Sequence, residues 1–389
     1  MKLIFFLINM NFGGTEKSFL NLVDTLPEDY EIDLMLIEKK GDLLKDLPER
    51  VNLLDTLSDT NISSRLTCSP FENIKSFLRK REFLKAFRGF IYYLKYKLTE
   101  NHKFIFKIFE NEIPEISDRY DIAVAYSGPH SFLTYFVAEK VNSKKKYQWI
   151  HFDVTLIPFS VKTNKDLLKN FDEIKVVSKT ARDNFVKLLP GLSEKTNVFK
   201  NIINIENIKK MATVSGEGFD DSFDGIRILT VGRLTGQKAY DLAVPAVSML
   251  VKQGTRIRYY IVGEGPKRNE LTQQIQQLNM ENHIFLLGSR ENPYPYMAQT
   301  DIYLQPSRHE GQGMTIVEAK TFCKPMILTN FTVAKDNITN GVNGLIVEMN
   351  SESIFQGIKR ILEDDKLRNL LTENLEFENE YENERELPF

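Results

Sequence analysis

Short apolar segments alternate with longer segments of helical periodicity along almost the whole chain, and this alternation constrains the fold more than any other feature. Strands separated by crossover helices are typical of a parallel sheet with helices on its faces. The strands that we expect are residues 2–8, 32–37, 121–126, 147–150 and 173–177 in the first half, and 226–231, 258–262, 283–287, 301–304, 325–329 and 345–347 in the second. Each half then has about the strands of one doubly wound sheet, which predicts an α/β protein.

Residues 201–225 interrupt the alternation and divide the chain in two. The segment contains Ser215, Gly216, Gly218 and several acidic residues, as is typical of a linker or a surface loop. A chain of 389 residues is long enough for two sizeable cores, at about 150 residues per domain. We therefore expect a Rossmann-like N-terminal domain over residues 1–200, a linker region over 201–225 and a Rossmann-like C-terminal domain over 226–389.

Composition excludes several classes of protein. The 51 basic and 53 acidic residues give a net charge of −2, so no overall field directs the chain toward nucleic acid. Cys68 and Cys323 are too few for a disulfide scaffold or a cysteine-rich metal site, and they suit a reducing cytoplasm. The apolar run of residues 3–8 is short for an export signal, and no apolar stretch reaches the roughly 20 residues that span a bilayer. We expect a cytoplasmic protein.

Residues 75–107 are rich in basic and aromatic side chains, with ten basic residues against two acidic ones. Apolar side chains recur at steps of three and four, as on one helical face, at Leu84, Phe87, Ile91, Leu94 and Leu98. A neighbouring stripe is basic and consists of Arg81, Lys85, Arg88 and Lys95. One interpretation is a core helix with a solvated basic face, and the other is an amphipathic helix that binds an anionic membrane surface. We expect the second, with the protein peripheral on the inner face of the cell membrane.

The stretch of residues 301–329 has the features of a phosphate-binding site. A strand ends near Gln305, a loop with Gly311 and Gly313 follows, and a helix opens at about Thr315. A glycine loop that leads into a helix presents backbone N–H groups and the positive end of the helix dipole to an anion. We therefore expect this loop to hold a phosphate.

Two carboxylates flank the glycine loop. Glu310 lies before it, where a carboxylate would accept hydrogen bonds from the hydroxyl groups of a sugar. Glu318 lies in the helix after it and has a structural alternative, because Thr315 and Glu318 also fit a capping box. Both carboxylates can project toward one ligand if the loop folds back between them.

Glu310 and Glu318, set in the stretch EGQGMTIVEA, resemble the signature of the retaining nucleotide-sugar glycosyltransferases of family 4. Further stretches are similar to that family in the same order along most of the chain: NFGGTEKSFLNL, QWIHFDV, VGRLTGQKAYDL and VGEGP. The resemblance implies the GT-B fold, in which two doubly wound domains face each other across a cleft. The first domain would then hold the acceptor and the second the nucleotide-sugar donor.

The resemblance also implies a set of donor-binding residues. They are Gly13, Gly14, Arg233, Lys238, Gly311, Gly313, Met314, Thr315 and Glu318. Arg233, Lys238 and the backbone amides of residues 313–315 would contact the diphosphate, and Glu318 the ribose. The alternative interpretation of Arg233 or Lys238, each taken singly, is a solvated surface charge. Their order along the chain with Glu310 and Glu318 favours a binding site. A charged hydrogen bond to phosphate contributes about 1.5 to 3 kcal/mol.

The catalytic residues that the resemblance implies are His151 and Glu310. His151 follows a strand and would face the donor sugar, oriented by Asp153. The alternative is a core histidine bonded to such a neighbour. Glu310 would position the sugar while the leaving phosphate takes the acceptor proton, or it would act as the nucleophile; both mechanisms stay open.

The predicted function is retaining transfer of a sugar from a UDP-linked donor to a hydroxyl acceptor, a lipid-linked glycan in the synthesis of a cell-surface polysaccharide such as capsule or teichoic acid. We expect no metal, because no D-x-D pair is placed to hold one and Arg233 and Lys238 can offset the charge of the leaving group, and no cofactor besides the donor. The alternatives are a nucleotide-sugar epimerase of the same fold and a non-catalytic GT-B partner protein. Three positions depart from the family pattern: Gln312 replaces an apolar residue, and Ala239 and Ile202 replace glycine.

Overall fold

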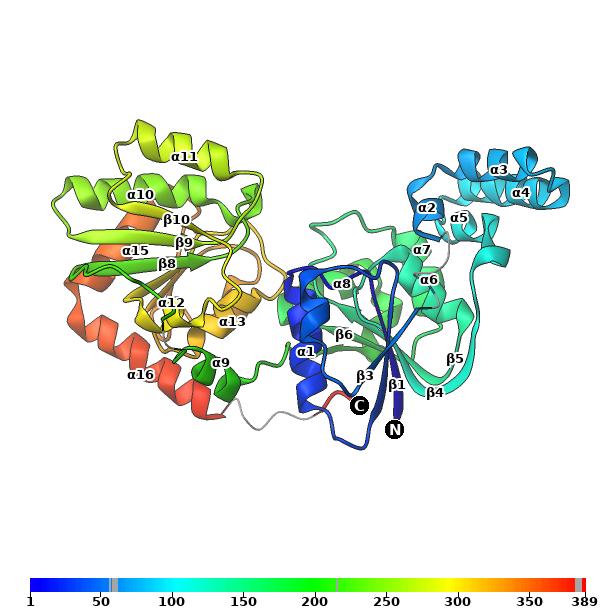
Figure 1. Ribbon diagram of the computed structural model, residues 1–389, viewed down its shortest axis with the longest axis horizontal. Coiled ribbons are helices and arrows are strands. Elements are labelled where there is room, and N and C mark those ends of the chain that lie inside the picture. Colours follow the sequence, from blue (N-terminus) through cyan, green and yellow to red (C-terminus); the bar gives the residue numbers. More distant parts are fainter. Residues whose placement is uncertain (56, 58–61, 215, 382–386) are drawn as a thin grey trace. The chain divides into compact units, whose positions relative to one another are not determined.

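The computed structural model describes residues 1–55, 57, 62–214, 216–381 and 387–389. The chain divides into two compact units, Met1–Ile202 and Ile203–Phe389. Each unit contains a parallel sheet flanked by helices (Figure 1). The predicted α/β architecture of two Rossmann-like units is therefore confirmed.

In the described residues of the first unit, the sheet has the strand order β3-β2-β1-β4-β5-β6-β7. Its strands are β1 (Lys2–Leu7), β2 (Glu31–Leu36), β3 (Val51–Leu54), β4 (Ile116–Ala125), β5 (Val141–Ile150), β6 (Glu173–Val176) and β7 (Thr196–Val198). β3 and β7 were not expected from the sequence. They are short, partly exposed edge strands, and they lack the continuous apolar run of a strand buried on both faces.

The first unit has two groups of helices. Those interleaved with the strands of the sheet are α1 (Gly14–Thr25), α6 (Ser131–Lys140), α7 (Val161–Leu168) and α8 (Lys179–Leu188). Those inserted between β3 and β4 are α2 (Ile62–Thr67), α3 (Pro70–Arg79), α4 (Phe83–Thr99) and α5 (Lys103–Ile108), followed by the short helix η2 (Glu110–Glu112). The inserted helices lie to one side of the sheet, with α3 and α4 farthest from it (Figure 1). The basic, aromatic segment of residues 75–107 therefore extends over α3, α4 and α5.

In the described residues of the second unit, the sheet has the strand order β10-β9-β8-β11-β12-β13. Its strands are β8 (Ile226–Val231), β9 (Ile257–Val262), β10 (Ile284–Gly288), β11 (Ile302–Gln305), β12 (Met326–Thr329) and β13 (Leu345–Val347). The helices are α9 (Ile205–Met211), α10 (Tyr240–Lys252), α11 (Arg268–Gln277), α12 (Tyr294–Gln299), α13 (Met314–Lys320), α14 (Ala334–Asn337), α15 (Ser351–Glu363) and α16 (Asp365–Tyr381), with the short helix η4 (Gly236–Lys238).

Part of the segment expected as a linker is helical. Asn204 caps α9 by accepting a hydrogen bond from the Asn207 backbone, and Ile205 and Ile208 are buried, so this helix packs as part of the second unit. Ser215 lies outside the described residues. Of the helices in the described ranges, none combines the length and the apolar character needed to cross a membrane.

Candidate active site

The loops that follow β8 and β11 form the candidate active site of the second unit. The two strands are parallel neighbours, so their carboxyl ends lie at the same edge of the sheet, where α/β proteins bind ligands. The Arg308 backbone N–H donates to the Gln237 carbonyl at 2.7 Å, and the Gln237 side chain donates to the His309 carbonyl at 2.9 Å. These bonds hold the two loops together.

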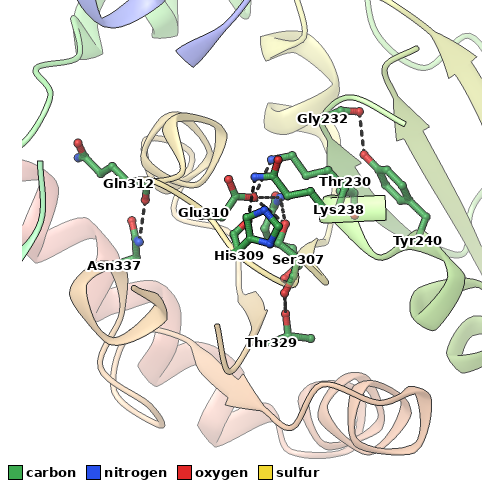
Figure 2. A network of polar contacts seen from close by, with 12 residues as sticks. Thr230, Gly232, Lys238, Tyr240, Ser307, His309, Glu310, Gln312, Thr329 and Asn337 are labelled. Carbon is green, nitrogen blue, oxygen red and sulfur yellow. Dashed lines mark hydrogen bonds and ion pairs between the residues drawn. The ribbon is translucent and has the colours of Figure 1, made fainter. Parts of the chain in front are cut away.

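Lys238 and Glu310 meet at the point where the two loops join. The Lys238 Nζ atom lies 2.7 Å from Glu310 Oε1, and both side chains are largely buried (Figure 2). An ammonium group has three donors, so Lys238 can hold Glu310 and still donate to an anion. The structure thus brings together two of the residues that the sequence predicted for one site.

Two buried polar residues that sequence reasoning missed donate to Glu310, and two more support them. Ser307 Oγ donates to Glu310 Oε1 at 2.6 Å (Figure 2). Gln305 Nε2 donates to the same oxygen at 3.0 Å. The Thr329 hydroxyl donates to the Ser307 carbonyl at 2.6 Å, and the Tyr303 hydroxyl donates to Gln305 Oε1 at 2.9 Å. Their position in the sequence could have indicated this role, because polar residues at the carboxyl end of a buried parallel strand lie at the edge of the sheet where ligands bind.

Glu318 is fully buried in α13, and the hydroxyl of Tyr294 donates to it at 3.2 Å. The capping-box alternative is wrong, because the helix begins at Met314 with Gly313 as its N-cap and lacks a side-chain cap. Burial raises the pKa of Tyr303, and the charges of Glu318 and Glu310 raise it further. Both carboxylates therefore act electrostatically on one tyrosine hydroxyl.

The glycine loop before α13 has the geometry that its sequence predicts. Gly313 has a φ of 84°, in the left-handed region, and a Cβ there would lie 2.7 Å from the Ile316 side chain. Gln312 is buried, and its carbonyl accepts a hydrogen bond from Asn337 at 2.8 Å (Figure 2). Gly311 is partly exposed beside it. The loop therefore leads directly into the backbone amides of Met314 and Thr315.

The loop after β8 contains the second departure from the family pattern. Ala239 is fully buried and has φ and ψ angles of 51° and 38°, a left-handed conformation that favours glycine. The chain accepts alanine at this strained position, directly after Lys238. Arg233 is exposed in the same loop, and Tyr240 donates to the Gly232 carbonyl at 2.8 Å (Figure 2).

His151 lies at the end of β5 in the first unit and is 5% exposed. Its ring packs 4.7 Å from the Tyr126 ring, and neither ring nitrogen reaches a hydrogen-bond partner in the described part of the chain. Burial lowers the pKa of His151 to about 3, although the Tyr126 backbone favours the charged form. The imidazole is therefore neutral at physiological pH.

The expected contact between Asp153 and His151 is not formed. Asp153 accepts hydrogen bonds from the Thr155 hydroxyl at 2.7 Å and from the Asn184 side chain at 2.8 Å, because both close over it from its own loop and from α8. His151 is thus not oriented by Asp153.

Gly13 and Gly14 lie where β1 leads into α1. Gly13 is the N-cap and Gly14 the first residue of the twelve-residue helix. A Cβ at Gly13 would come within 2.3 Å of the Glu16 carboxylate, which lies at the end of a flexible side chain and can move away. Deeper in α1, Ser18 contacts the Tyr126 hydroxyl at 2.7 Å, which links the helix to the aromatic ring beside His151.

Comparison with known proteins finds similarity to glycosyltransferases. Residues 222–376 match the family model of glycosyl transferases group 1. A curated relative from Campylobacter jejuni, N-acetylgalactosamine-N,N'-diacetylbacillosaminyl-diphospho-undecaprenol 4-alpha-N-acetylgalactosaminyltransferase, is 35% identical over 177 residues, which is 45% of this chain and 46% of the relative. The chain spans less than half the length of the first curated relatives that it matches.

Solved structures match the whole chain. A glycosyltransferase from Rickettsia africae has a TM-score of 0.69 at 19% identity, over 97% of this chain and 92% of that one. HepE from Anabaena, solved in complex with UDP, has a TM-score of 0.67 at 18% identity, over 97% and 94%.

The two parallel-sheet units and the likeness to these structures define the chain as a protein of the GT-B glycosyltransferase fold. Residues 222–376, in its second unit, match the glycosyl transferases group 1 family. The family resemblance that the sequence predicted is therefore confirmed.

Proposed function

We propose that the protein is a retaining glycosyltransferase that moves a sugar from a UDP-linked donor to a hydroxyl group of a lipid-linked glycan. The contact between Lys238 and Glu310 carries the proposal. A nucleotide sugar has an anionic diphosphate next to neutral hydroxyl groups, and an adjacent cation and carboxylate match these two parts. The UDP bound to HepE supports the choice of nucleotide.

The roles of the second-unit residues follow from their chemistry. Lys238 and Arg233 would bind the diphosphate together with the backbone of residues 311–315, and this offsets the charge that develops on the leaving group. Glu310 would accept hydrogen bonds from the donor sugar, and Glu318 from the ribose. We propose that two cations suffice for this task without a metal ion.

The transfer breaks the bond between the anomeric carbon and the phosphate oxygen and forms a bond to the acceptor oxygen on the same face. The acceptor proton passes to the leaving phosphate, and UDP departs. Glu310 positions the sugar in this scheme; the alternative is that Glu310 attacks first as a nucleophile. His151 would contact the sugar as a neutral hydrogen-bonding group, since burial lowers its pKa to about 3, and Gly13 and Gly14 would let the backbone approach the donor phosphates.

The acceptor and the location are proposed together. The Campylobacter relative is named for a diphospho-undecaprenol acceptor, which is a lipid-linked sugar. The basic, aromatic segment of residues 75–107 suits a cytoplasmic protein that is peripheral on the inner face of the cell membrane, where a polysaccharide such as capsule or teichoic acid is assembled on lipid.

Nucleotide release from a panel of UDP- and GDP-sugars tests the reaction, and calorimetry with UDP tests the site. Lys238→Ala removes a charged hydrogen bond worth about 1.5 to 3 kcal/mol, so we expect UDP binding to weaken by about ten- to a hundredfold. Lys366→Ala, at an exposed position in α16, is the matched control and should bind UDP as the wild type does.

The outcomes separate the alternatives. Absence of UDP binding to the wild type would favour a non-catalytic GT-B partner. Conversion of a UDP-sugar into its epimer without any acceptor would favour an epimerase.

A further inference from the structure

The outward face of α4 consists of large apolar side chains. They are Phe83, Leu84, Phe87, Phe90, Ile91, Leu94 and Leu98. Each is between 39% and 86% exposed, and their spacing places them on one side of the helix. Monomeric proteins rarely expose a contiguous apolar patch of this kind unless it binds something.

The opposite face of α4 packs the helix onto its own unit through small residues. Ala86 and Gly89 are buried, and a Cβ at Gly89 would lie 3.2 Å from both Ile74 of α3 and Ile108 of α5. This close packing excludes the interpretation of α4 as a core helix that buries Leu84 and Phe87. The apolar face that the sequence predicted is therefore turned away from the core.

The helix α3, against which α4 packs, is held in place by buried Arg65. Its guanidinium donates to both Glu112 oxygens at 2.7 Å, and also to Asn73 and Ser76 of α3. Ser69 and Glu72 form a complete capping box at the start of α3. The apolar face is thus presented on a fixed support.

The cations around the face have divided roles. Lys85 pairs with Glu82 and Arg88 with Glu110, each at 2.9 Å, so half of the predicted basic stripe is neutralised within the unit. Lys95 and Lys97 are exposed, and helical spacing places them on the two borders of the apolar face. Exposed Arg79, Lys80 and Arg81 form the turn between α3 and α4.

We infer that the apolar face of α4 inserts into the interfacial layer of an anionic lipid membrane, with Lys95, Lys97 and the cations of the α3–α4 turn at the level of the lipid phosphates. The inference rests on the proposed function in taking this membrane as the one that carries the acceptor. Charge selects the occupant, because two copies docked through this face would bring like charges together. A helix with an apolar face between basic borders lies in the plane of the interface.

Flotation of the full-length protein with vesicles of phosphatidylglycerol and phosphatidylcholine tests the inference. The triple variant Leu84→Ser, Phe87→Ser, Leu98→Ser changes only strongly exposed side chains, so it keeps the fold and should lose at least tenfold in vesicle binding. The matched control changes three exposed apolar residues of the second unit, Val214→Ser, Val342→Ser and Leu370→Ser, and should float as the wild type does. Lys95→Gln with Lys97→Gln should weaken binding roughly fivefold per residue.

A tryptophan probe reports insertion directly. Trp149 is the single native tryptophan and is buried, so it gives a constant background. The emission of Leu84→Trp should shift to shorter wavelength with anionic vesicles and be quenched by brominated lipid, whereas Leu370→Trp should show neither change.

Three results would overturn the inference: a triple variant that floats like the wild type, equal binding of the wild type to vesicles of phosphatidylcholine alone, or a wild-type dimer in light scattering that the triple variant abolishes. UDP calorimetry on the same triple variant separates the two proposals. Loss of flotation with unchanged UDP binding supports insertion, whereas a wild type that floats but binds no UDP defeats the proposed function and leaves the inference standing.

Discussion

Two buried polar side chains, Glu310 of the second unit and His151 of the first, are held in opposite ways. In the second unit Glu310 is held by Lys238, Ser307 and Gln305, within 3.0 Å of each. In the first unit His151 is buried against Tyr126 with both ring nitrogens unpartnered. A buried polar group without a partner costs folding free energy, so the first unit retains a feature that packing alone does not favour. The Glu310 carboxylate is therefore held in position by the protein itself. The His151 ring nitrogens are not held in this way, and a ligand could bond to them.

We expect the largest effect from neutralising Glu310, the carboxylate at the centre of the second-unit network. Glu310→Gln keeps the size of the side chain. If Glu310 contacts the donor sugar as proposed, we expect turnover of the donor to fall about 10²- to 10³-fold, because the side chain loses its charge. UDP binding should stay within a few-fold, because Lys238 is unchanged. Steady-state kinetics and calorimetry measure the two effects.

The control for this variant is Glu363→Gln, at an exposed position near the end of α15, which should leave both quantities unchanged. Near wild-type turnover of Glu310→Gln would mean that the network serves folding alone.

The second prediction concerns the pH dependence that His151 imposes. The unfolded chain protonates this imidazole near pH 6.5 and the folded chain near pH 3, so between these values the unfolded state binds more protons. The free energy of unfolding should therefore decrease as pH falls, by about 2 to 3 kcal/mol between pH 6.5 and 4.5 from this residue. Urea unfolding at pH 7 and 4.5 should show a smaller decrease for His151→Gln than for the wild type. Equal decreases in both proteins would contradict the idea of a buried, neutral ring.

The third prediction tests a positioning role in the second-unit network. Ser307→Ala removes one donor to Glu310 and leaves Lys238 and Gln305 in place, so we expect kcat to fall about three- to tenfold with little change in KM. Urea unfolding should show a loss of about 1 to 2 kcal/mol.

Ser307→Thr, which keeps the hydroxyl, should recover part of the lost kcat. Equal loss in both variants would point to crowding at the site in place of the hydrogen bond.

The smallest expected effect is a gain in stability. Ala239→Gly relieves a left-handed conformation that an L side chain disfavours by roughly 1 kcal/mol, so the urea midpoint should rise by an amount equivalent to about 0.5 to 1 kcal/mol. Ala243→Gly, in the middle of α10, is the matched control and should lose stability. UDP binding should stay within twofold in both variants, and a loss of binding in Ala239→Gly would show that the strain serves the site.

Much of the fold could be predicted from the sequence where burial is continuous. Every strand of the second sheet ends within one residue of its expected position, because these strands are buried apolar runs. β4 and β5 begin at Ile116 and Val141, well before the expected residues 121 and 147. These two residues are buried, but most of the residues between them and the expected starts are polar and exposed, so the apolar run is interrupted. Apolar runs thus locate the buried core of a sheet and miss its solvated extensions.

Only some residues of the candidate site could be predicted from the sequence. Lys238 and Glu310 could be predicted to belong to one site because the stretches that contain them resemble the family pattern in the same order along the chain. Ser307 and Gln305 could not, because serine and glutamine are common at surfaces and only their burial beside Glu310 gives them a role. The predicted contact between Asp153 and His151 was wrong, because the Thr155 hydroxyl and the Asn184 side chain bond to the Asp153 carboxylate instead. The sequence did not indicate that Asn184 of α8 would lie beside Asp153.

The bonds between the Arg308 and Gln237 loops have a thermodynamic consequence for recognition. The conformational entropy of ordering both loops is lost during folding, so a nucleotide that binds there as proposed would meet loops that are already ordered. Association with such loops should show a modest negative heat-capacity change, without the large value that accompanies the folding of a segment around its ligand.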